Sequence, residues 1–279
     1  MNSKSRYLAY PYSIWMLVFI LFPLFLIFLY SITLRNPNDI KTITFTFENF
    51  GKFFDPIYVN VLIRSISIAA LSTGICLIVG YPVAYLLTRA KDKHKGLMIL
   101  LFILPMWMNM LLRTYAWMTI LGNTGLINSF LNLLNLPNVN LLYNNKAVIL
   151  GMVYNFLPFM VFPIYTALNK MDRSLIEAAD DLGADGFTIF KRVIFPLSLP
   201  GVISGIVMVF MPAVSTFVIP RLLGGGKNVL IGNLIEKLFL VTRDWNFGAA
   251  LSMIILIIIF ISIKILNILK IDKESGVSI

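Results

Sequence analysis

Residues 174–184 read Ser-Leu-Ile-Glu-Ala-Ala-Asp-Asp-Leu-Gly-Ala, and the segment continues through Phe190 to Pro196. It is the one long stretch that is polar, acidic and helix-patterned in a chain otherwise made of apolar runs. Ser174 followed by Glu177 is the pattern of a capping box and predicts a helix start. One helical face then collects four residues at i, i+3, i+4 and i+7, namely Leu175, Ala178, Ala179 and Leu182.

The same segment predicts a bend and a second helix. Gly183 stands where helices commonly end in a left-handed residue. A second short helix is expected to begin at Asp185, to present Phe187, Phe190 and Ile194, and to stop at Pro196. Two short amphipathic helices joined by a bend, lying between apolar runs, indicate a docking surface.

Composition identifies the class of protein. Hydrophobic residues make up 58% of the 279 residues and charged residues 13%, whereas a soluble domain has roughly 25% charged residues. The chain is therefore expected to be an integral membrane protein. Its net charge of +10 does not indicate nucleic acid binding, because the basic residues are scattered between apolar runs, as expected for loops that face a bilayer.

The inventory of reactive side chains is small. The chain has one cysteine, Cys76, and one histidine, His94, so no disulfide, zinc site or Cys/His nucleophile pair is expected. The run from Gly224 to Lys227 is not a nucleotide-binding loop, because Asn228 stands where Ser or Thr should follow. The sequence thus predicts no catalytic residue, no metal and no cofactor bound by this chain.

Six charge-poor windows are each long enough to cross a bilayer as a helix, which needs about 20 residues. The first, Ile14 to Ile32, is too long for a signal peptide and is expected to stay in place, with a kink at Pro23. The other windows are Arg64–Arg89, Lys95–Arg113, Lys146–Lys170, Arg192–Arg221 and Asp244–Lys264. An all-α protein with six transmembrane helices follows, with both termini on one side.

The connection after the first span is ambiguous. The alternating residues 42–47 suggest a short strand, while residues 50–54 suggest an interfacial helix. The sequence leaves both alternatives open.

Loop charges set the orientation. Arg89, Lys91, Lys93 and Lys95 crowd into one tight turn, which is typical of a cytoplasmic loop. This orientation places both termini and residues 172–196 inside. Five prolines interrupt the spans, which suggests a bundle around a path rather than a plain anchor: Pro82, Pro105, Pro158, Pro163 and Pro212.

Candidate path residues are the polar and aromatic ones near the middle of two spans. They are Tyr154, Asn155 and Phe156 in the fourth span, and Ser215 and Phe217 in the fifth. Ordinary packing between membrane helices is an equally good reading, although aromatic faces can also hold ammonium groups. Three basic residues near span ends are expected to extend toward the interface, with a position in the path as the alternative, namely Arg64, Arg113 and Lys264.

Glu177-Ala178-Ala179 followed by Gly183, Pro196-Leu197 and Pro200-Gly201 resembles the "EAA" loop of ABC importer permease subunits. The resemblance implies a MetI-like type I bundle, with a core at 57–270, a coupling loop at 172–196, an N-terminal part at 1–56 and a tail at 271–279. It also implies that the loop fits a groove of the ATP-hydrolysing subunit through Glu177, Ala178, Ala179, Asp181, Gly183, Ala184 and Phe190. Asp180 departs from the family pattern, in which a basic residue is expected.

Three further segments, 153–160, 230–235 and 243–250, look like polyamine importer permeases. The resemblance implies a spermidine or putrescine permease in the inner membrane of a bacterium. Its expected partners are a dimer of ATP-binding subunits that uses ATP and magnesium, a second permease subunit and an extracytoplasmic polyamine-binding protein. The alternatives are a permease for another solute and a self-sufficient secondary transporter.

Overall fold

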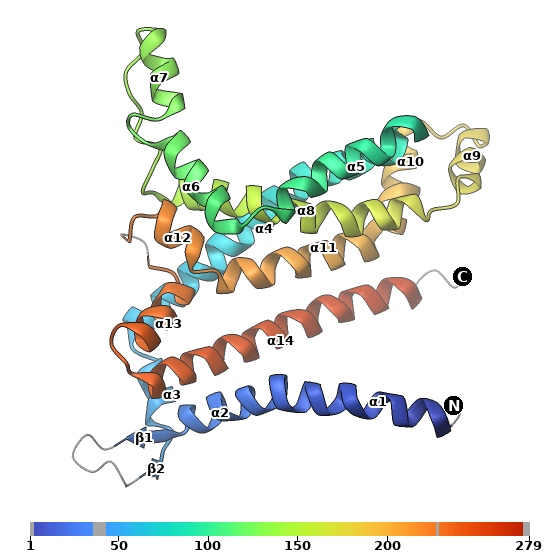
Figure 1. Cartoon of the computed structure of the whole chain (residues 1–279). Helices are drawn as coiled ribbons and strands as arrows, with labels where there is room; N and C mark the ends of the chain where they lie inside the picture. Colours follow the sequence, from blue (N-terminus) through green and yellow to red (C-terminus); the bar gives the residue numbers. More distant parts are fainter. Residues whose placement is uncertain (1–2, 36–42, 227–228, 276–279) are drawn as a thin grey trace. The chain divides into compact units, whose positions relative to one another are not determined.

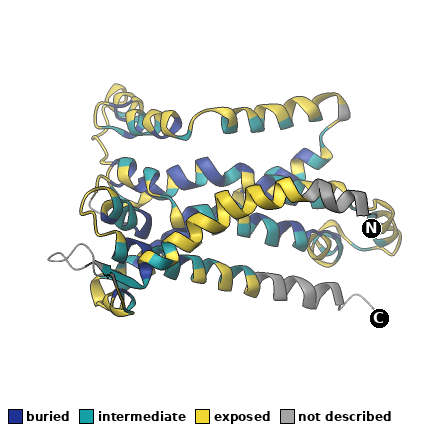
Figure 2. Ribbon diagram, turned by 60° about the horizontal axis from the view of Figure 1, so that its bottom comes forward, coloured by how far each residue is buried: buried dark blue, intermediate teal, exposed yellow. Residues whose placement is uncertain are grey.

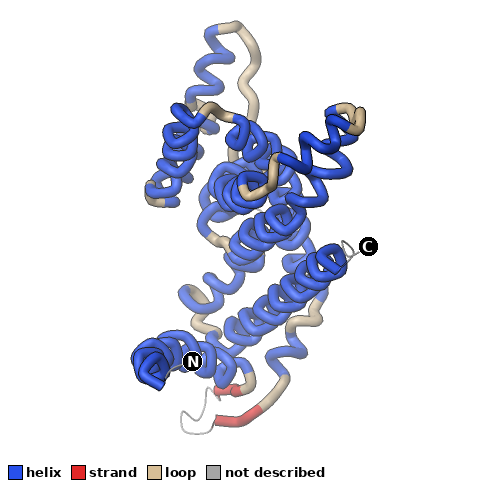
Figure 3. Tube along the Cα trace, turned by 90° about the vertical axis from the view of Figure 1, so that its right-hand side faces the viewer, coloured by secondary structure: helices blue, strands red, loops and turns tan. Residues whose placement is uncertain are grey.

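The computed structural model describes residues 3–35, 43–226 and 229–275, so Thr42, Lys227 and Asn228 lie outside the described residues. The regular elements of the described residues are helices, apart from two short strands (Figures 1 and 3). Its elements are α1 (Ser3–Met16), η1 (Leu17–Leu21), α2 (Phe22–Ser31), β1 (Thr33–Arg35), β2 (Ile43–Phe45), α3 (Glu48–Lys52), α4 (Pro56–Arg89), α5 (Asp92–Trp107), α6 (Met110–Leu121), α7 (Leu126–Leu133), α8 (Asn145–Asn169), α9 (Ser174–Asp181), α10 (Gly186–Ile189), η2 (Phe190–Ile194), α11 (Phe195–Ser215), α12 (Val218–Leu223), α13 (Ile231–Leu240) and α14 (Trp245–Ser275).

The prediction of an all-α membrane protein is confirmed. Five helical stretches are long and apolar enough to cross a bilayer, and a bent helix pair brings the number to six. The five stretches are Tyr10–Ser31, Pro56–Arg89, Asn145–Asn169, Gly186–Ser215 and Trp245–Ile265.

The third predicted span, Lys95–Arg113, contains a break between two helices. The chain bends by 92° between Lys93–Trp107 and Met110–Leu133. Asn109 is the reason, because its side chain accepts a hydrogen bond from the amide of Leu111 at 2.8 Å and starts a new helix.

The described residues divide into two compact units, 1–62 with 234–260, and 63–233 with 261–279. In the first unit, β1 and β2 form an antiparallel pair in which Leu34 lies opposite Thr44. Both alternatives for the connection are therefore present, a strand at 43–45 and a helix at 48–52. The first span carries a π-turn at 17–21, just before Pro23, where a missing amide favours a widened turn.

The second unit is built around α8, which has buried residues along its whole length from Ala147 to Leu168. Figure 2 colours the described chain by burial. Close packing of α11 on α8 depends on Gly201 and Gly205, a small-xxx-small pair of the kind that lets membrane helices approach. A Cβ at Gly201 would lie 2.6 Å from the carbonyl oxygen of Pro163, and one at Gly205 would lie 2.7 Å from the sulfur of Met160.

Helix α4 also packs on α8 within this unit. A Cβ at Gly80 would lie 3.1 Å from Met160, and the hydroxyl of Ser72 donates to the sulfur of Met152 at 3.5 Å. The hydroxyls of Tyr81 and Ser198 are 2.8 Å apart, which ties α4 to α11. Residues far apart in the sequence thus form one core around the fourth span.

Candidate functional site

The segment at 172–196 forms an elbow, which we define as α9, the bend at 182–185 and α10 with η2. Helix α9 begins at Ser174 as predicted, but the capping box is wrong. Instead, the carboxylate of Asp172 accepts a hydrogen bond from the amide of Ser174 at 3.0 Å, in a turn that leads into the helix. That hydrogen bond also holds the pKa of Asp172 below its ordinary value.

The predicted bend at Gly183 is confirmed. Its φ is +79°, and two hydrogen bonds close the end of α9 in a Schellman motif. The amide of Gly183 donates to the carbonyl of Asp180 at 2.8 Å, and the amide of Ala184 donates to the carbonyl of Ala179 at 3.1 Å. The Thr188 hydroxyl beside Asp185 lowers the pKa of that carboxyl at the start of the next helix.

The prediction that Pro196 stops the second helix is wrong. Helix α10 runs through η2 into α11, and Gly186 to Ser215 forms one helical stretch. The amide of Phe195 bonds the carbonyl of Phe190, five residues earlier. This wide turn puts Pro196 in the first turn of α11, where a residue without an amide proton is tolerated.

Aromatic rings fix the far arm of the elbow to the spans. The ring of Phe190 makes edge contacts with Tyr81 at 5.7 Å and Tyr85 at 6.4 Å, and it lies 6.2 Å from Phe195. Ile189 and Ile194 beside it are buried. Movement of the elbow is therefore mechanically linked to α4 and α11.

The expected coupling residues divide into two groups. Glu177, Ala178, Asp181 and Gly183 are exposed. Ala179, Ala184 and Phe190 are half-buried, and Phe190 serves as the ring that anchors the elbow.

Large apolar side chains also project from the elbow. Leu182 is 88% exposed and Phe187 is 71% exposed, although both were expected on apolar helix faces. Exposed apolar groups on an otherwise polar segment are typical of a protein-binding surface.

A cavity of about 430 Å³ lies beside the elbow. Arg89, at the end of α4, lines this cavity. Arg173, just before α9, and Glu177, within α9, line it as well. The guanidinium of Arg89 lies 4.4 Å from the ring centre of Tyr85. No sequence pattern indicated this cavity, because its walls come from segments about 80 residues apart.

The three path candidates in α8 have different surroundings. Phe156 is buried, and Tyr154 makes an edge contact with the ring of Trp117 at 5.4 Å. Asn155 is buried, and its amide nitrogen donates to the carbonyl of Gly151 at 2.8 Å. Its Oδ1 has no hydrogen-bond partner among the described residues.

The two candidates in the fifth span lie at a helix break. Helix α11 ends at Ser215, and both Ser215 and Phe217 are exposed. Asn233 donates to the carbonyl of Phe217 at 2.7 Å, and Gly232 approaches Ser215 so closely that a Cβ would lie 2.6 Å from its carbonyl oxygen. Ser215 and Phe217 are therefore exposed, whereas Asn155 in the fourth span is buried.

Arg113 was expected to extend toward the interface, and that prediction is wrong. Its side chain is only 9% exposed, and Nε and Nη1 have no hydrogen-bond partner among the described residues. The bend before α6 turns this arginine inward, which the linear charge pattern could not indicate.

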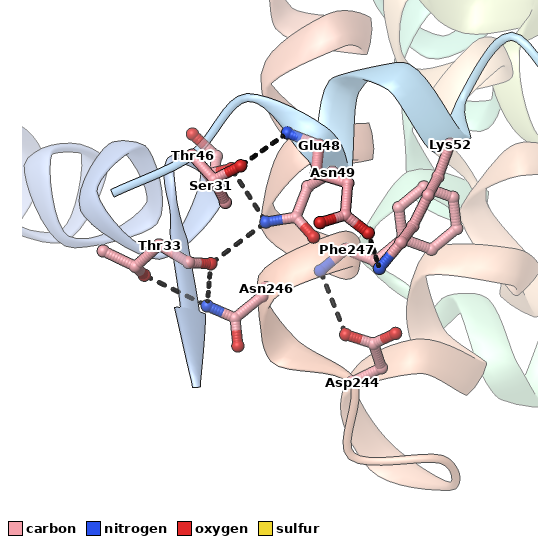
Figure 4. Close-up of polar contacts among 9 residues, drawn as sticks. All are labelled: Ser31, Thr33, Thr46, Glu48, Asn49, Lys52, Asp244, Asn246 and Phe247. Carbon is pink, nitrogen blue, oxygen red and sulfur yellow. Dashed lines mark hydrogen bonds and ion pairs between the residues drawn. The ribbon is translucent and has the colours of Figure 1, made fainter. Parts of the chain in front are cut away.

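A separate polar cluster braces the first unit (Figure 4). Asn246 donates to the carbonyl oxygen of Thr33 at 2.6 Å, and it also donates to that of Tyr30 at 3.0 Å. Asn49 donates to the carbonyl of Thr33 at 3.0 Å and to that of Ser31 at 3.2 Å. The segment at 243–250, singled out from the sequence, thus fixes the end of α2 to the start of α14.

Comparison with known proteins gives consistent matches. The family model described as "Binding-protein-dependent transport system inner membrane component" matches residues 1–270. The chain is 40% identical over 241 residues to the spermidine/putrescine transport system permease protein PotB of Haemophilus influenzae, covering 85% of this chain and 84% of that protein. It is 39% identical over 246 residues to PotB of Escherichia coli K12, covering 88% of this chain and 90% of that protein.

Solved structures share the fold. A chain of a bacterial ABC transporter involved in the import of the acidic polysaccharide alginate superposes with a TM-score of 0.78 at 18% identity, covering 95% of this chain and 96% of that chain. A second alginate transporter structure, in complex with a periplasmic protein bound to an alginate pentasaccharide, gives a TM-score of 0.77 at 18% identity, covering 95% of this chain and 94% of that chain. At this identity the match concerns the fold alone.

Proposed function

The chain belongs to the binding-protein-dependent transport system inner membrane component family, and we propose that the solute it carries inward across the cytoplasmic membrane is a polyamine, spermidine or putrescine. The chain is a multi-pass inner-membrane permease of an ABC importer and not an enzyme. The observation that carries the choice of solute is the 40% identity to a spermidine/putrescine permease over 85% of the chain.

Energy would reach this chain through the elbow. ATP and magnesium would be used by a dimer of partner ATPase subunits, with the exposed Glu177, Ala178 and Asp181 against their surface. Closure of the ATPases would push on α9. Because Phe190 is packed on Tyr81 and Tyr85, the push would tilt α4 and α11 together, as a rigid-body movement.

The remaining partners follow from the same scheme. ABC importer permeases work with ATPase subunits and an extracytoplasmic binding protein, and here the binding protein would deliver the polyamine. A second, PotC-like permease would complete the path. The basic turn from Arg89 to Lys95 supports an orientation with the elbow and both termini in the cytoplasm.

The path would use the polar and aromatic groups of α8 and the break after α11. Tyr154 with its neighbour Trp117 presents aromatic surface that can attract an ammonium group. Asn155 supplies an Oδ1 without a partner among the described residues. Phe156, Ser215 and Phe217 would complete this lining.

Uptake by the reconstituted complex tests the proposal. Vesicles containing the permease pair, the ATPase and the binding protein should accumulate labelled spermidine or putrescine only with ATP, and not alginate fragments or sulfate. Uptake of another solute with no polyamine uptake would refute the choice of solute. Transport by this chain alone, driven by an ion gradient, would refute the ABC mechanism.

A further inference from the structure

The cavity beside the elbow lies where two spans end. Tyr85, Thr88 and Arg89 come from the last turn of α4, and Leu168 and Asn169 come from the last turn of α8. Residues at the ends of membrane-spanning helices lie near the level of the lipid headgroups. The cavity is therefore within reach of lipid as well as of water.

The cavity contains more positive than negative charge. Arg89 and Arg173 line it with a single carboxylate, Glu177, so these side chains sum to a charge of +1. Neither arginine forms an ion pair with a side chain that the structure describes. The guanidinium of Arg89 lies over the ring of Tyr85, which does not accept conventional hydrogen bonds at its face, so the N–H donors of Arg89 can bind an oxyanion.

Beside these charges, the cavity has a polar part at Thr88 and Asn169 and an apolar part. Leu168, Met171, Ile176 and Ile194 line the same cavity. A free phosphate ion gains nothing from such side chains, whereas the glycerol and first acyl carbons of a lipid do. The two arginines with the polar Thr88 and Asn169, set beside four apolar groups, thus fit an amphiphile with a phosphate ester.

We propose that this cavity binds the headgroup of one anionic phospholipid of the inner leaflet. The phosphate lies between Arg89 and Arg173, whose two charges exceed the single charge of Glu177 at the cavity wall. Basic pockets between helices on the cytoplasmic side are suited to such headgroups. The lipid would then hold α9 against the end of α4, so that membrane composition sets the position of the elbow.

The inference rests on the proposed function in one respect, namely that the elbow and the cavity beside it face the cytoplasm. Binding is therefore measured on the full chain without ATPase or polyamine. Native mass spectrometry counts the lipid retained when the purified chain is titrated with dioleoylphosphatidylglycerol or dioleoylphosphatidylcholine. We expect one phosphatidylglycerol to bind about tenfold more tightly than phosphatidylcholine.

Three variants locate the site. The double variant Arg89→Gln with Arg173→Gln should lose that preference, whereas Lys91→Gln with Lys93→Gln removes the same charge from exposed positions outside the cavity and should keep it. Thr88→Phe keeps both arginines but occupies the cavity, and it should lower the affinity to that for phosphatidylcholine. Circular dichroism verifies that each variant keeps the helical content of the parent.

Several results would overturn the proposal. Equal losses in the two double variants would mean diffuse attraction of lipid to a basic surface. Unchanged binding by Thr88→Phe would place the lipid elsewhere. Displacement of the lipid by millimolar inorganic phosphate, or equal binding of glycerol phosphate without acyl chains, would identify a soluble phosphate compound as the ligand instead.

Discussion

Replacing Gly183 by alanine should loosen the elbow without creating any clash. A Cβ at Gly183 would meet no atom within 4 Å, so the whole penalty comes from the backbone. The φ of +79° is left-handed, and an L-residue there costs about 1–2 kcal/mol. A change of this size lowers the ratio of bent to opened conformations by a factor of roughly 5–30.

The assay is amide exchange at Ala184, whose amide closes the Schellman motif onto the carbonyl of Ala179. Gly183→Ala should raise that exchange rate by roughly 5–30-fold, with a smaller increase for Gly183→Asn, because asparagine tolerates left-handed backbone. ATP-driven uptake should fall in the same order.

Gly186→Ala is the matched control. Gly186 has no positive φ and open space around its Cβ position, so the same added methyl group should leave the Ala184 amide unaffected. An exchange rate within twofold of the parent in Gly183→Ala, or an equal rise in Gly186→Ala, would refute the reasoning.

Three further predictions concern other parts of the chain. Gly201→Ala should destabilise the chain in detergent by about 1–3 kcal/mol, because the new Cβ would lie 2.6 Å from the carbonyl oxygen of Pro163. In the control Gly74→Ala the new Cβ meets nothing within 4 Å, so the melting temperature should not fall, and an equal fall in both variants would contradict the packing of α11 on α8. Arg113→Met should stabilise the isolated chain by about 1–3 kcal/mol, because the buried Nε and Nη1 of Arg113 have no hydrogen-bond partner among the described residues. A lower melting temperature in this variant would mean that the guanidinium does donate hydrogen bonds to an acceptor in the chain. The Ser174 amide lowers the pKa of Asp172, so the stabilisation that the Asp172 carboxylate gives to α9 is present above the unfolded-state pKa and is lost as pH falls through the folded-state pKa. Protection of the Ser174 amide should therefore decrease below about pH 4 in the parent but not in Asp172→Asn. A pH response that survives in this variant would exclude Asp172 as its source.

Much of the fold follows from the sequence because every helix that crosses a bilayer must be a continuous apolar run of sufficient length. Each span must be about 20 apolar residues long, and charge-poor windows reveal that directly. The elbow was equally accessible, since helix ends are local: Gly183 closes α9 as its position in the pattern predicted. These features depend on residues within one or two turns of one another.

The errors arose where neighbouring signals competed or where distant segments met. Asp172 and Ser174 both offer a capping oxygen, and the structure uses Asp172. Pro196 ends a helix only when the preceding turn is regular, and here that turn is π-helical. The burial of Arg113 depends on a bend and on packing between helices, neither of which is written in a local pattern.

Labelling of a cysteine at Leu182 tests the central claim most directly, namely that the elbow receives the ATPase in the cytoplasm. Leu182 is 88% exposed and Cys76, the chain's one cysteine, is buried, so Leu182→Cys provides a single reactive site. A membrane-impermeant maleimide should label it in inside-out vesicles only, and bound ATPase should protect it. Labelling from the outside, or labelling that the ATPase leaves unchanged, would contradict the account.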